Sequence, residues 1–536
     1  MTEQIELESV DLNIMYPNEM LLDYLNGKSP MRDFFNNKPE NLHPVRYSGN
    51  RSILKETLLK YNKSIDAHDN VLANIETVED ENVKFVITGQ QPGLLTGPLY
   101  TIYKTFSAIN YAKYYSTEET KLIPLFWNAS EDHDVEEVNN IWILNRENDV
   151  VPVQVDTQSY TGKSLENLSI EKEKITHIIE YLIQNLPQTE FTDEIFQKFI
   201  LDTLNKSQKW GEFFSRMLSQ LMKQYGLILI EPKVLRPFLT DYFTKLISDP
   251  IHYNNIFLNT TQQLTDLGYK PKMHKKENIA GLFYIDDENN RNTITLNDSN
   301  IYEMTSDVSF TKEEILNEIQ KRPERFSTNA IFRPLAQDTL FPTYIFVGGP
   351  SEIGYHIQIK DLYKEFNLQQ PNLHFRMGAT MIERHINRIL EKYNFKITEL
   401  KDLNILAKNI LQNEDNNLLA KYFTQISSTY DDMQSELTKY NQELGSRVEN
   451  RKNSIMKELS NIEKMYLKYV KDENQILTSQ LEKAKAFIFP SDKPQERIMN
   501  IFQYLNKYSF TILECMRNLL SKNQPGKHVI LKCWMF

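Results

Sequence analysis

The sequence predicts an α/β protein with a doubly wound parallel sheet, a large insertion and a long helical arm. Two apolar strands, 85–87 and 122–128, flank one segment with helical spacing. Strand, helix and strand in succession are typical of a parallel βαβ unit. A third apolar strand, 343–349, comes much later and again leads through glycines into a helix. The stretch 395–485 is charged, almost free of Pro and Gly, and carries a heptad-like apolar repeat, which favours a coiled coil.

The first strand leads into a glycine-rich loop, and the segment 84–104 reads KFVITGQQPGLLTGPLYTIYK. Gly89, Gly93 and Gly97 mark the loop, and Pro98 stands where a helix can begin. A loop that opens a helix can leave backbone N–H groups free for an anion. The spacing fits neither a P-loop nor G-x-G-x-x-G. The loop therefore predicts a nucleotide or anionic-substrate site, with an ordinary turn as the alternative.

The second strand ends in an acidic group around one histidine, Glu131-Asp132-His133-Asp134. Ligands bind at the carboxyl ends of parallel strands, where this group and the glycine loop would both lie. Neighbouring acids raise the pKa of an imidazole and orient it, which suits a general base or acid. The same side chains could hold a divalent ion, or could simply favour a helix N-terminus through its dipole. We expect His133 to be the base, supported by Asp132 and Asp134.

The third strand ends in Gly348-Gly349-Pro350-Ser351 and predicts a second half of the same crevice. Lys104 could bind a phosphate or carboxylate, although a lysine one turn into a helix is usually solvated. Arg376 could grip a carboxylate with two hydrogen bonds. The substrate-binding residues expected around the three strand ends are Thr88, Gln90, Gln91, Gly97, Tyr100, Lys104, Asn128, Ser351, Glu352, His356 and Arg376.

The chain divides into five predicted segments. They are N-terminal helices with the first half of the sheet (1–140), an insertion (141–330), the second half of the sheet (331–394), a coiled-coil arm that dimerises (395–485) and a tail that folds back on the sheet (486–536). The apolar stripe of the arm comprises Met433, Leu437, Tyr440, Leu444, Val448, Ile455, Leu459, Ile462, Tyr466 and Tyr469. A helix packed on its own domain is the alternative to a homodimer arm.

Composition limits the function classes. The 536 residues carry a net charge of −11, which argues against nonspecific nucleic-acid binding. No stretch approaches about 18 uninterrupted apolar residues, so no membrane span is expected. The N-terminus has no signal-peptide pattern, and two cysteines in so long a chain fit a reducing compartment. We expect a cytoplasmic protein without a thiolate zinc site, and predict no metal.

Three blocks together carry a family resemblance: TGQQPGLLTGPLYTIYK at 88–104, FWNASEDHD at 126–134 and GGPSEIGYH at 348–356. With them the chain resembles the cysteine ligase family of bacillithiol biosynthesis, BshC, over nearly its whole length. The resemblance implies a Rossmann-like core related to class I aminoacyl-tRNA synthetases, connecting-peptide insertions and a dimerising coiled coil. It also implies amide formation between L-cysteine and glucosaminyl-malate, with nucleotide binding and ATP as the candidate activating cofactor.

The sequence departs from class I synthetases at their two signature motifs. Neither His-x-Gly-His nor Lys-Met-Ser-Lys-Ser is present; 97–100 and 376–380 stand in the corresponding places. The thiolate ligands with which related enzymes hold the cysteine sulfur on zinc are also missing. A cytoplasmic, dimeric cysteine ligase is the leading expectation. The alternatives are a nucleotide-sensing coiled-coil assembly protein and a nucleotidyltransferase that acts on another acceptor.

Overall fold

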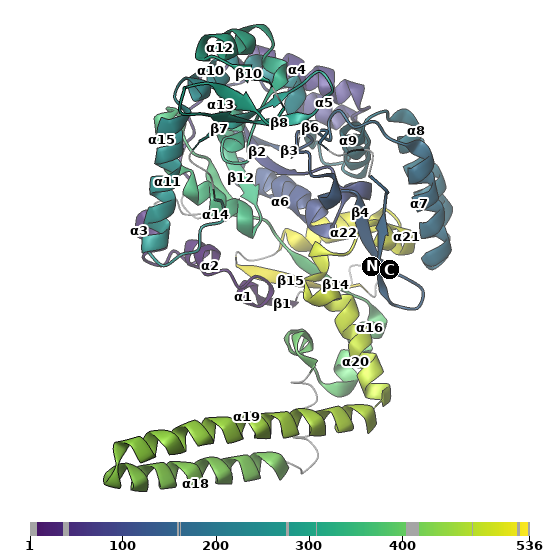
Figure 1. The fold of residues 1–536 in the computed structure, drawn as a ribbon. Coiled ribbons are helices and arrows are strands. Elements are labelled where there is room, and N and C mark those ends of the chain that lie inside the picture. The colour runs from purple at the N-terminus through teal and green to yellow at the C-terminus, as the bar shows by residue number, and fades with distance from the viewer. Residues whose placement is uncertain are drawn as a thin grey trace. The chain divides into compact units, whose positions relative to one another are not determined.

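The protein is built around a five-stranded, wholly parallel sheet (Figure 1). The computed structural model describes residues 8–35, 42–157, 160, 162–274, 278–306, 308–403, 418–473, 475–522 and 526–533. The strand order is β13 (Asn372–Phe375), β12 (Thr343–Gly348), β2 (Val83–Gln90), β3 (Lys121–Asn128) and β6 (Ile228–Ile230). The predicted α/β parallel core is confirmed.

The central strands are continuous apolar runs, because both faces of the sheet are covered. β2 pairs with β3 in unbroken register from Val83 opposite Lys121 to Gln90 opposite Asn128. Helix α6 (Leu99–Tyr115) connects these two strands, packs on both and is buried along most of its length. The two strands therefore end side by side, and their following loops emerge at one edge of the sheet.

Further helices of the sheet domain precede or flank these strands. They are α1 (Leu12–Met15), α2 (Glu19–Leu25), α3 (Met31–Phe34), α4 (Arg51–Ser64), α5 (Asp69–Glu76), α13 (Arg333–Leu340), α14 (Pro350–Gln358) and α15 (Lys360–Glu365). α4 packs on β6, and α14 packs on β13. Within the described residues, no helix is long and apolar enough to cross a membrane.

The region between β3 and β12 supplies one strand of the main sheet and two further substructures. A hairpin and a set of helices come first: β4 (Asn140–Leu144), β5 (Val150–Gln154), α7 (Lys172–Asn185), the π-helix η4 (Asp193–Ile200), α8 (Leu201–Lys206) and α9 (Trp210–Leu221). The apolar run around Leu229 then enters the main sheet as β6, beside β3. A strand of the main sheet thus lies within the predicted insertion. The apolar run of β6 is too short to show from the sequence that it belongs to the main sheet.

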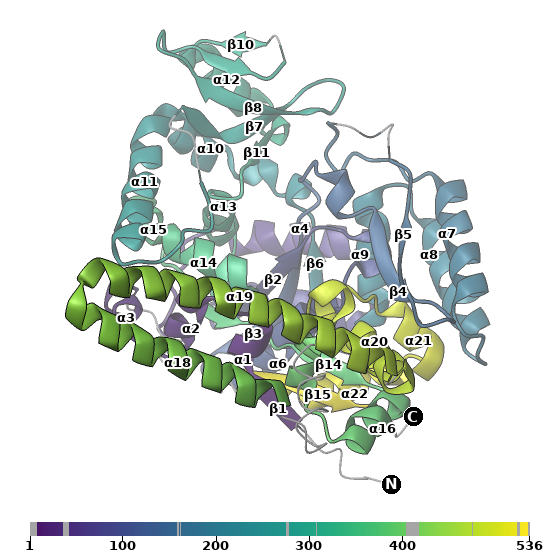
Figure 2. The ribbon, with the colours of Figure 1, turned by 60° about the horizontal axis from the view of Figure 1, so that its bottom comes forward.

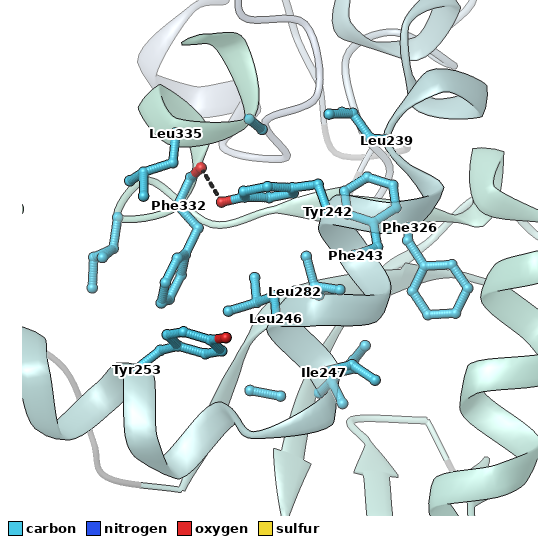
Figure 3. Packing of buried hydrophobic residues seen from close by; sticks show 14 of the residues in the cluster. Leu239, Tyr242, Phe243, Leu246, Ile247, Tyr253, Leu282, Phe326, Phe332 and Leu335 are labelled. Carbon is cyan, nitrogen blue, oxygen red and sulfur yellow. Dashed lines mark hydrogen bonds between the residues drawn. The ribbon is translucent and has the colours of Figure 1, made fainter. Parts of the chain in front are cut away.

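A second, antiparallel sheet follows β6. Its order is β10 (Ser309–Phe310), β9 (Tyr302–Met304), β8 (Arg291–Leu296), β7 (Ile279–Ile285) and β11 (Phe326–Thr328), with helices α10 (Thr240–Ser248), α11 (Pro250–Asp266) and α12 (Lys312–Lys321). Figure 3 shows its core, where Phe243, Leu246 and Phe332 are fully buried. The hydroxyl of Tyr242 donates to the carbonyl of Phe332 at 2.8 Å, so the one polar atom of that ring is satisfied.

The chain forms two compact units, residues 1–381 with 494–531 and residues 382–493, with a few C-terminal residues in each. In the first unit, the C-terminal segment contributes α21 (Phe502–Tyr508), α22 (Thr511–Leu520) and β15 (Lys527–Lys532). β15 lies between β1 (Glu8–Asp11) and β14 (Ala379–Ile382) in a three-stranded sheet. β14 thus pairs with the distant C-terminus, and helix α16 (Arg384–Tyr393) begins only after this strand.

The second unit is helical, with a hairpin of α18 (Leu418–Tyr440) and α19 (Gln442–Glu473), followed by α20 (Gln475–Ile488). α18 and α19 lie side by side (Figures 1 and 2). The contacts Asp431–Lys452 at 2.6 Å and Gln434–Glu449 at 3.3 Å show that they are antiparallel. The apolar stripe is therefore not continuous along one helix, because the chain reverses at Asn441.

Candidate functional site

A cavity of about 280 Å³ opens at the carboxyl ends of β2, β3 and β12. This is the edge at which parallel sheets of this type bind ligands. Its lining residues are Gly89, Gln90, Gln91, Tyr100, Lys104, Trp127, Ala129, Arg333, Gly349, Pro350, Ser351, Glu352, Tyr355, Arg376 and Arg497. The cavity thus combines the two predicted glycine loops with residues from α13 and the C-terminal segment.

The first glycine loop is a tightly closed turn. A Cβ atom on Gly93 would lie 2.7 Å from Cα of Gly97, which itself has a φ of +70°. Asn500 donates to the carbonyls of Leu95 and Gly97 at 2.8 and 2.7 Å. The N–H groups of Gly93, Leu94 and Gly97 donate to backbone carbonyls. The expectation of free N–H groups is wrong for these residues, and side chains supply the cavity's positive charge instead.

Lys104 lies at the centre of a buried polar cluster. Its ammonium donates to the carbonyl of Gly89 at 2.8 Å and to Oε1 of Gln90 at 2.9 Å, and pairs with Glu352 at 2.5 Å. Gln90 in turn donates to the hydroxyl of Tyr100 at 3.1 Å. Burial lowers the pKa of Lys104, and the carboxylate of Glu352 opposes that shift. Glu352 also accepts from the N–H of Gly349 at 2.8 Å, which caps α14.

Arg376 is also neutralised from within the protein. Its Nη2 donates to Glu496 and to the hydroxyl of Tyr16, both at 2.7 Å, and Tyr16 in turn donates to Glu496. Glu496 is fully buried and also accepts from the N–H of Ala379 at 3.1 Å. The carboxylate of Glu496 keeps the pKa of Arg376 raised although burial opposes the charge. This network connects the N-terminal segment, the main sheet and the C-terminal segment behind the cavity wall.

Two other arginines of the cavity have no acidic partner among the described residues. Arg333 donates to the hydroxyl of Tyr355 at 2.8 Å and to Oε1 of Gln337 at 3.2 Å, both neutral acceptors. Arg497 is exposed, and its guanidinium lies 5.9 Å from the ring centre of Tyr100. Since Lys104 and Arg376 already face carboxylates, the cavity presents about two uncompensated positive charges. That arrangement suits a dianion, because guanidinium groups bind carboxylate and phosphate with two parallel hydrogen bonds.

The structure brings part of the predicted substrate-binding set into this cavity: Gln90, Gln91, Tyr100, Lys104, Ser351, Glu352 and Arg376. Gly97 closes the turn described above. Thr88 is buried and donates to the carbonyl of Val347 at 2.9 Å. Asn128 is buried and donates to the carbonyl of Gly211 and the hydroxyl of Ser215. Neither of these side chains lines the cavity.

His356 lies inside the fold rather than on the cavity wall. Its ring packs 4.0 Å from the ring centre of Phe346 and 5.1 Å from that of Tyr355. Burial lowers its pKa well below the usual range, so the imidazole is neutral. Both ring nitrogens lack a hydrogen-bond partner among the described residues.

The predicted catalytic group is divided between two places. His133 and Asp134 line a separate hollow with Glu136, Gln154 and Asp156. Asp132 accepts from Gln91 at 2.8 Å and so contacts a cavity residue. In the described part of the chain, no group of His, Cys, Asp and Glu side chains is arranged to hold a metal ion.

The predicted substrate-binding set does not include four lining residues, Trp127, Arg333, Tyr355 and Arg497. Arg497 stands in a Gln-Glu-Arg run of the tail. Arg333 precedes a proline at the start of α13, which is an ordinary helix start. No local pattern distinguishes these arginines, since only the tertiary fold brings them to the strand ends.

The parallel sheet and its glycine-marked strand ends define a Rossmann-like α/β protein with a cation-rich cavity at the carboxyl ends of the strands. Two family models match the chain: the N-terminal Rossmann-like domain of bacillithiol biosynthesis BshC at residues 5–377, and the C-terminal coiled-coil domain of the same family at residues 379–533. The chain belongs to the BshC family.

Relatives match over nearly full length. A Bacillus cytotoxicus protein named "Putative cysteine ligase BshC" is 31% identical and covers 90% of each chain. A Bacillus cereus protein of the same name is 29% identical over 96% of this chain and 98% of its own. A tryptophanyl-tRNA synthetase from Plasmodium falciparum aligns with 88% of this chain and 99% of its own, at 11% identity and a TM-score of 0.21. That score is too low to support any argument.

Proposed function

We propose that this protein is a ligase that joins the carboxyl group of L-cysteine to the amine of glucosaminyl-malate, the last step of bacillithiol biosynthesis. The name of the relatives supports the cysteine half of this reaction. The observation that carries the other half is the pair of arginines, Arg333 and Arg497, that face the cavity without an acidic partner among the described residues. A malyl group carries two carboxylates, and its charge matches theirs.

The cavity offers distinct contacts to the parts of such a substrate. Arg333 and Arg497 bind the two malyl carboxylates. Gln90 and Ser351 are amide and hydroxyl groups that can hydrogen-bond the sugar hydroxyls. Tyr100 and Tyr355 provide aromatic faces beside them. Arg376, whose side chain is fixed by Glu496, adds positive charge to the cavity wall and stabilises the conformation of the wall.

A free carboxylate does not form an amide with an amine at neutral pH without activation. We infer that a nucleoside triphosphate, ATP in the first instance, is the co-substrate that converts the cysteine carboxylate to an acyl phosphate or acyl adenylate. No residue is assigned to the nucleotide, since the N–H groups of Gly93, Leu94 and Gly97 in the glycine loop donate to backbone carbonyls. The nucleotide consumed by purified protein in the presence of both substrates identifies it.

A deletion strain tests the proposed function in the cell. Without the protein, glucosaminyl-malate should accumulate and bacillithiol should be absent, and the intact chain should restore the thiol. Unchanged bacillithiol in the deletion strain would contradict the ligase and favour a nucleotide-sensing assembly protein. Pyrophosphate release without cysteine would instead indicate a nucleotidyltransferase.

We also propose that the helical unit forms a homodimer, in the cytoplasm. Large apolar side chains are exposed on its helices, among them Tyr440, Leu444, Ile462, Met465, Tyr469 and Ile476. Exposed apolar surface of this kind favours a protein partner, and a second copy is the partner that every chain has. Cys515 and Cys533 are not joined in a disulfide, which fits a reducing compartment.

A further inference from the structure

Glu131, at the carboxyl end of β3, is a buried carboxylate without a direct partner. Only 6% of the residue is exposed. Among the described residues, its carboxylate accepts no hydrogen bond and forms no ion pair. Two buried acids nearby differ: Glu231 accepts from Ser130 and Tyr61 at 2.7 and 2.8 Å, and Glu166 holds Arg236 at 2.7 and 2.9 Å. Because a buried charge without hydrogen bonds is costly, the missing partner of Glu131 requires an explanation.

The charged groups around Glu131 do not supply that partner. Arg236 is committed to Glu166. Arg291 donates to the hydroxyl of Ser327 and the carbonyl of Thr328, and its guanidinium stacks 3.9 Å from the ring centre of Phe283.

Arg333 donates to Tyr355 and Gln337. Burial raises the pKa of the Glu131 carboxyl, while Arg291, Arg236 and Arg333 oppose that shift and Glu166 adds to it. The arginines thus act on Glu131 through their charge and direct their hydrogen bonds elsewhere.

Glu131 lies next to the cavity wall. Ala129, two residues earlier, lines the cavity, and its N–H donates to the carbonyl of the lining residue Gln90 at 3.0 Å. Arg333 is both a lining residue and one of the charged groups that act on Glu131. Arg333 therefore connects the cavity wall to Glu131.

We propose that Glu131 binds the ammonium group of the amine substrate and accepts its proton, as a catalytic residue of the ligase reaction. This rests on the proposed function. An ammonium group donates charge-assisted hydrogen bonds, which none of the three arginines donates to Glu131. In the step, one N–H bond of R–NH₃⁺ breaks, its proton passes to the carboxylate, and the nitrogen keeps the electron pair with which it attacks the activated cysteine carbonyl. The C–N bond forms, the C–O bond to the activating phosphate or AMP breaks, and that group leaves with the electron pair. The second proton of the nitrogen is released to solvent. A carboxyl whose pKa is raised by burial is better matched to this transfer near neutral pH.

Two ligands test the ammonium contact without catalysis. Glucosaminyl-malate and its N-acetylated form differ at the amine, and only the former carries an ammonium. Calorimetry should show that the wild-type protein prefers the amine about tenfold or more, the scale of a charge-assisted hydrogen bond. In Glu131→Gln this preference should disappear. Equal preference in both proteins, or none in the wild type, would overturn the proposal.

Turnover tests the proton transfer. Glu131→Gln should lower kcat about 10²–10⁴-fold at neutral pH, the usual contribution of a general base. The remaining rate should rise with pH as free amine appears in solution. Glu231→Gln is the matched control, because it removes an equally buried carboxylate that is already hydrogen-bonded. It should lower the melting temperature and leave the pH profile unchanged.

Thermal melting checks that Glu131→Gln is folded. If this variant is unfolded, Glu131→Asp is used in its place, because it keeps the negative charge on a shorter side chain. The shorter carboxylate should retain the amine preference and lose turnover. If kcat of Glu131→Gln stayed within about twofold of the wild-type value over the measured pH range, the role of Glu131 in catalysis would be overturned. Loss of amide formation in the wild type, with the amine preference intact, would contradict the ligase reaction and leave the ammonium site standing.

Discussion

Single residues in the cavity fall into two groups by their charge balance. Lys104 and Arg376 have carboxylate partners, Glu352 and Glu496, which hold them in place before any ligand arrives. Arg333 donates hydrogen bonds only to neutral acceptors, and Arg497 lies beside the ring of Tyr100, with no ion pair to either among the described residues. A ligand with two negative charges gains the most binding free energy from Arg333 and Arg497. Each contact with them forms a new ion pair, whereas a contact with Lys104 or Arg376 would compete with an ion pair inside the protein.

Removing either unbalanced arginine should weaken dianion binding. We expect Arg333→Gln and Arg497→Gln each to lower the affinity for malate about tenfold to a hundredfold, since hydrogen bonds between charged groups contribute about 1.5–3 kcal/mol. Calorimetry with malate measures this. Arg322→Gln, on an exposed helix and paired with Glu318, is the control and should bind as the wild type does. Unchanged affinity in both cavity variants would contradict the proposed malyl site.

Asp338, on α13 with Arg333, should make stability depend on pH. Burial raises the pKa of its carboxyl to about 6, although Thr343, Tyr363 and Gln337 stabilise the charge through hydrogen bonds. The folded protein therefore favours the protonated acid. Its contribution to stability is fully present below about pH 4 and is lost as pH rises toward about 6, by up to roughly 3 kcal/mol.

The variant Asp338→Asn should lack this part of the pH dependence. Urea unfolding at several pH values between 4 and 7 gives the free energy of unfolding of both proteins. We expect the wild type to lose stability relative to Asp338→Asn across that range. Parallel curves would show that Asp338 is ionised in the fold at all these pH values.

At the scale of elements, the glycine loop after β2 shows what the sequence could and could not predict. The strand, the turn and the start of α6 follow from local pattern: an apolar run, spaced glycines and a proline at the helix start. The bonding of the loop is not local. The carbonyls of Leu95 and Gly97 are held by Asn500 from the far end of the chain. The local sequence patterns of an anion-binding loop and of a structural turn are the same. Only the hydrogen-bond partners in the fold distinguish the two.

The close approach of Gly93 to Gly97 gives an element-level prediction. Gly93→Ala should lower the free energy of unfolding by about 1–3 kcal/mol, because the new methyl group would overlap backbone that cannot move aside. It should also reduce ligation by displacing Gln90 and Gln91. Gly268→Ala is the control: Gly268 has a φ of +89° with nothing within 4 Å, so it tests backbone strain alone. Equal activity of Gly93→Ala and the wild type would contradict the role of this turn.

In the arm, the sequence predicts the helices but not the turn between them. The heptad pattern predicts helices with an apolar seam, and the family model names a coiled-coil domain. The pattern does not reveal that the chain reverses. Asn441 accepts from the N–H of Glu443 at 2.7 Å, and a side chain at Gly445 would collide with Thr438. Leu437 and Leu459 are half-buried rather than exposed, so they are poor positions for testing association between chains.

At the scale of the whole molecule, the proposed homodimer is tested by exposed residues of the helical unit. Met465 and Ile476 are 72% and 75% exposed. We expect Met465→Asp with Ile476→Asp to convert a dimer of twice 63.2 kDa to a monomer in light scattering. Lys468→Asp, an exposed charge change on α19, should leave the dimer intact. A wild-type monomer, or a dimer that survives both apolar substitutions, would contradict this interface.

The cavity is assembled from distant parts of the first unit. Gln90 and Lys104 come from its first quarter, Arg333 and Glu352 from the region after the insertion, and Arg497 from the tail. Sequence patterns identify strand ends well, because apolar strands and glycine turns are local. Arg333 and Arg497 are not distinguished by such patterns, because only the fold brings them to the cavity.

One measurement tests the central claim most directly. Purified protein is incubated with L-cysteine, glucosaminyl-malate and each nucleoside triphosphate in turn, and the products are read by mass spectrometry. We expect the amide of the two substrates to form with one nucleotide in the wild type and to be lost in the Arg333→Gln, Arg497→Gln double variant. Failure of every nucleotide to yield the amide, or undiminished amide in the double variant, would contradict the proposed ligase site.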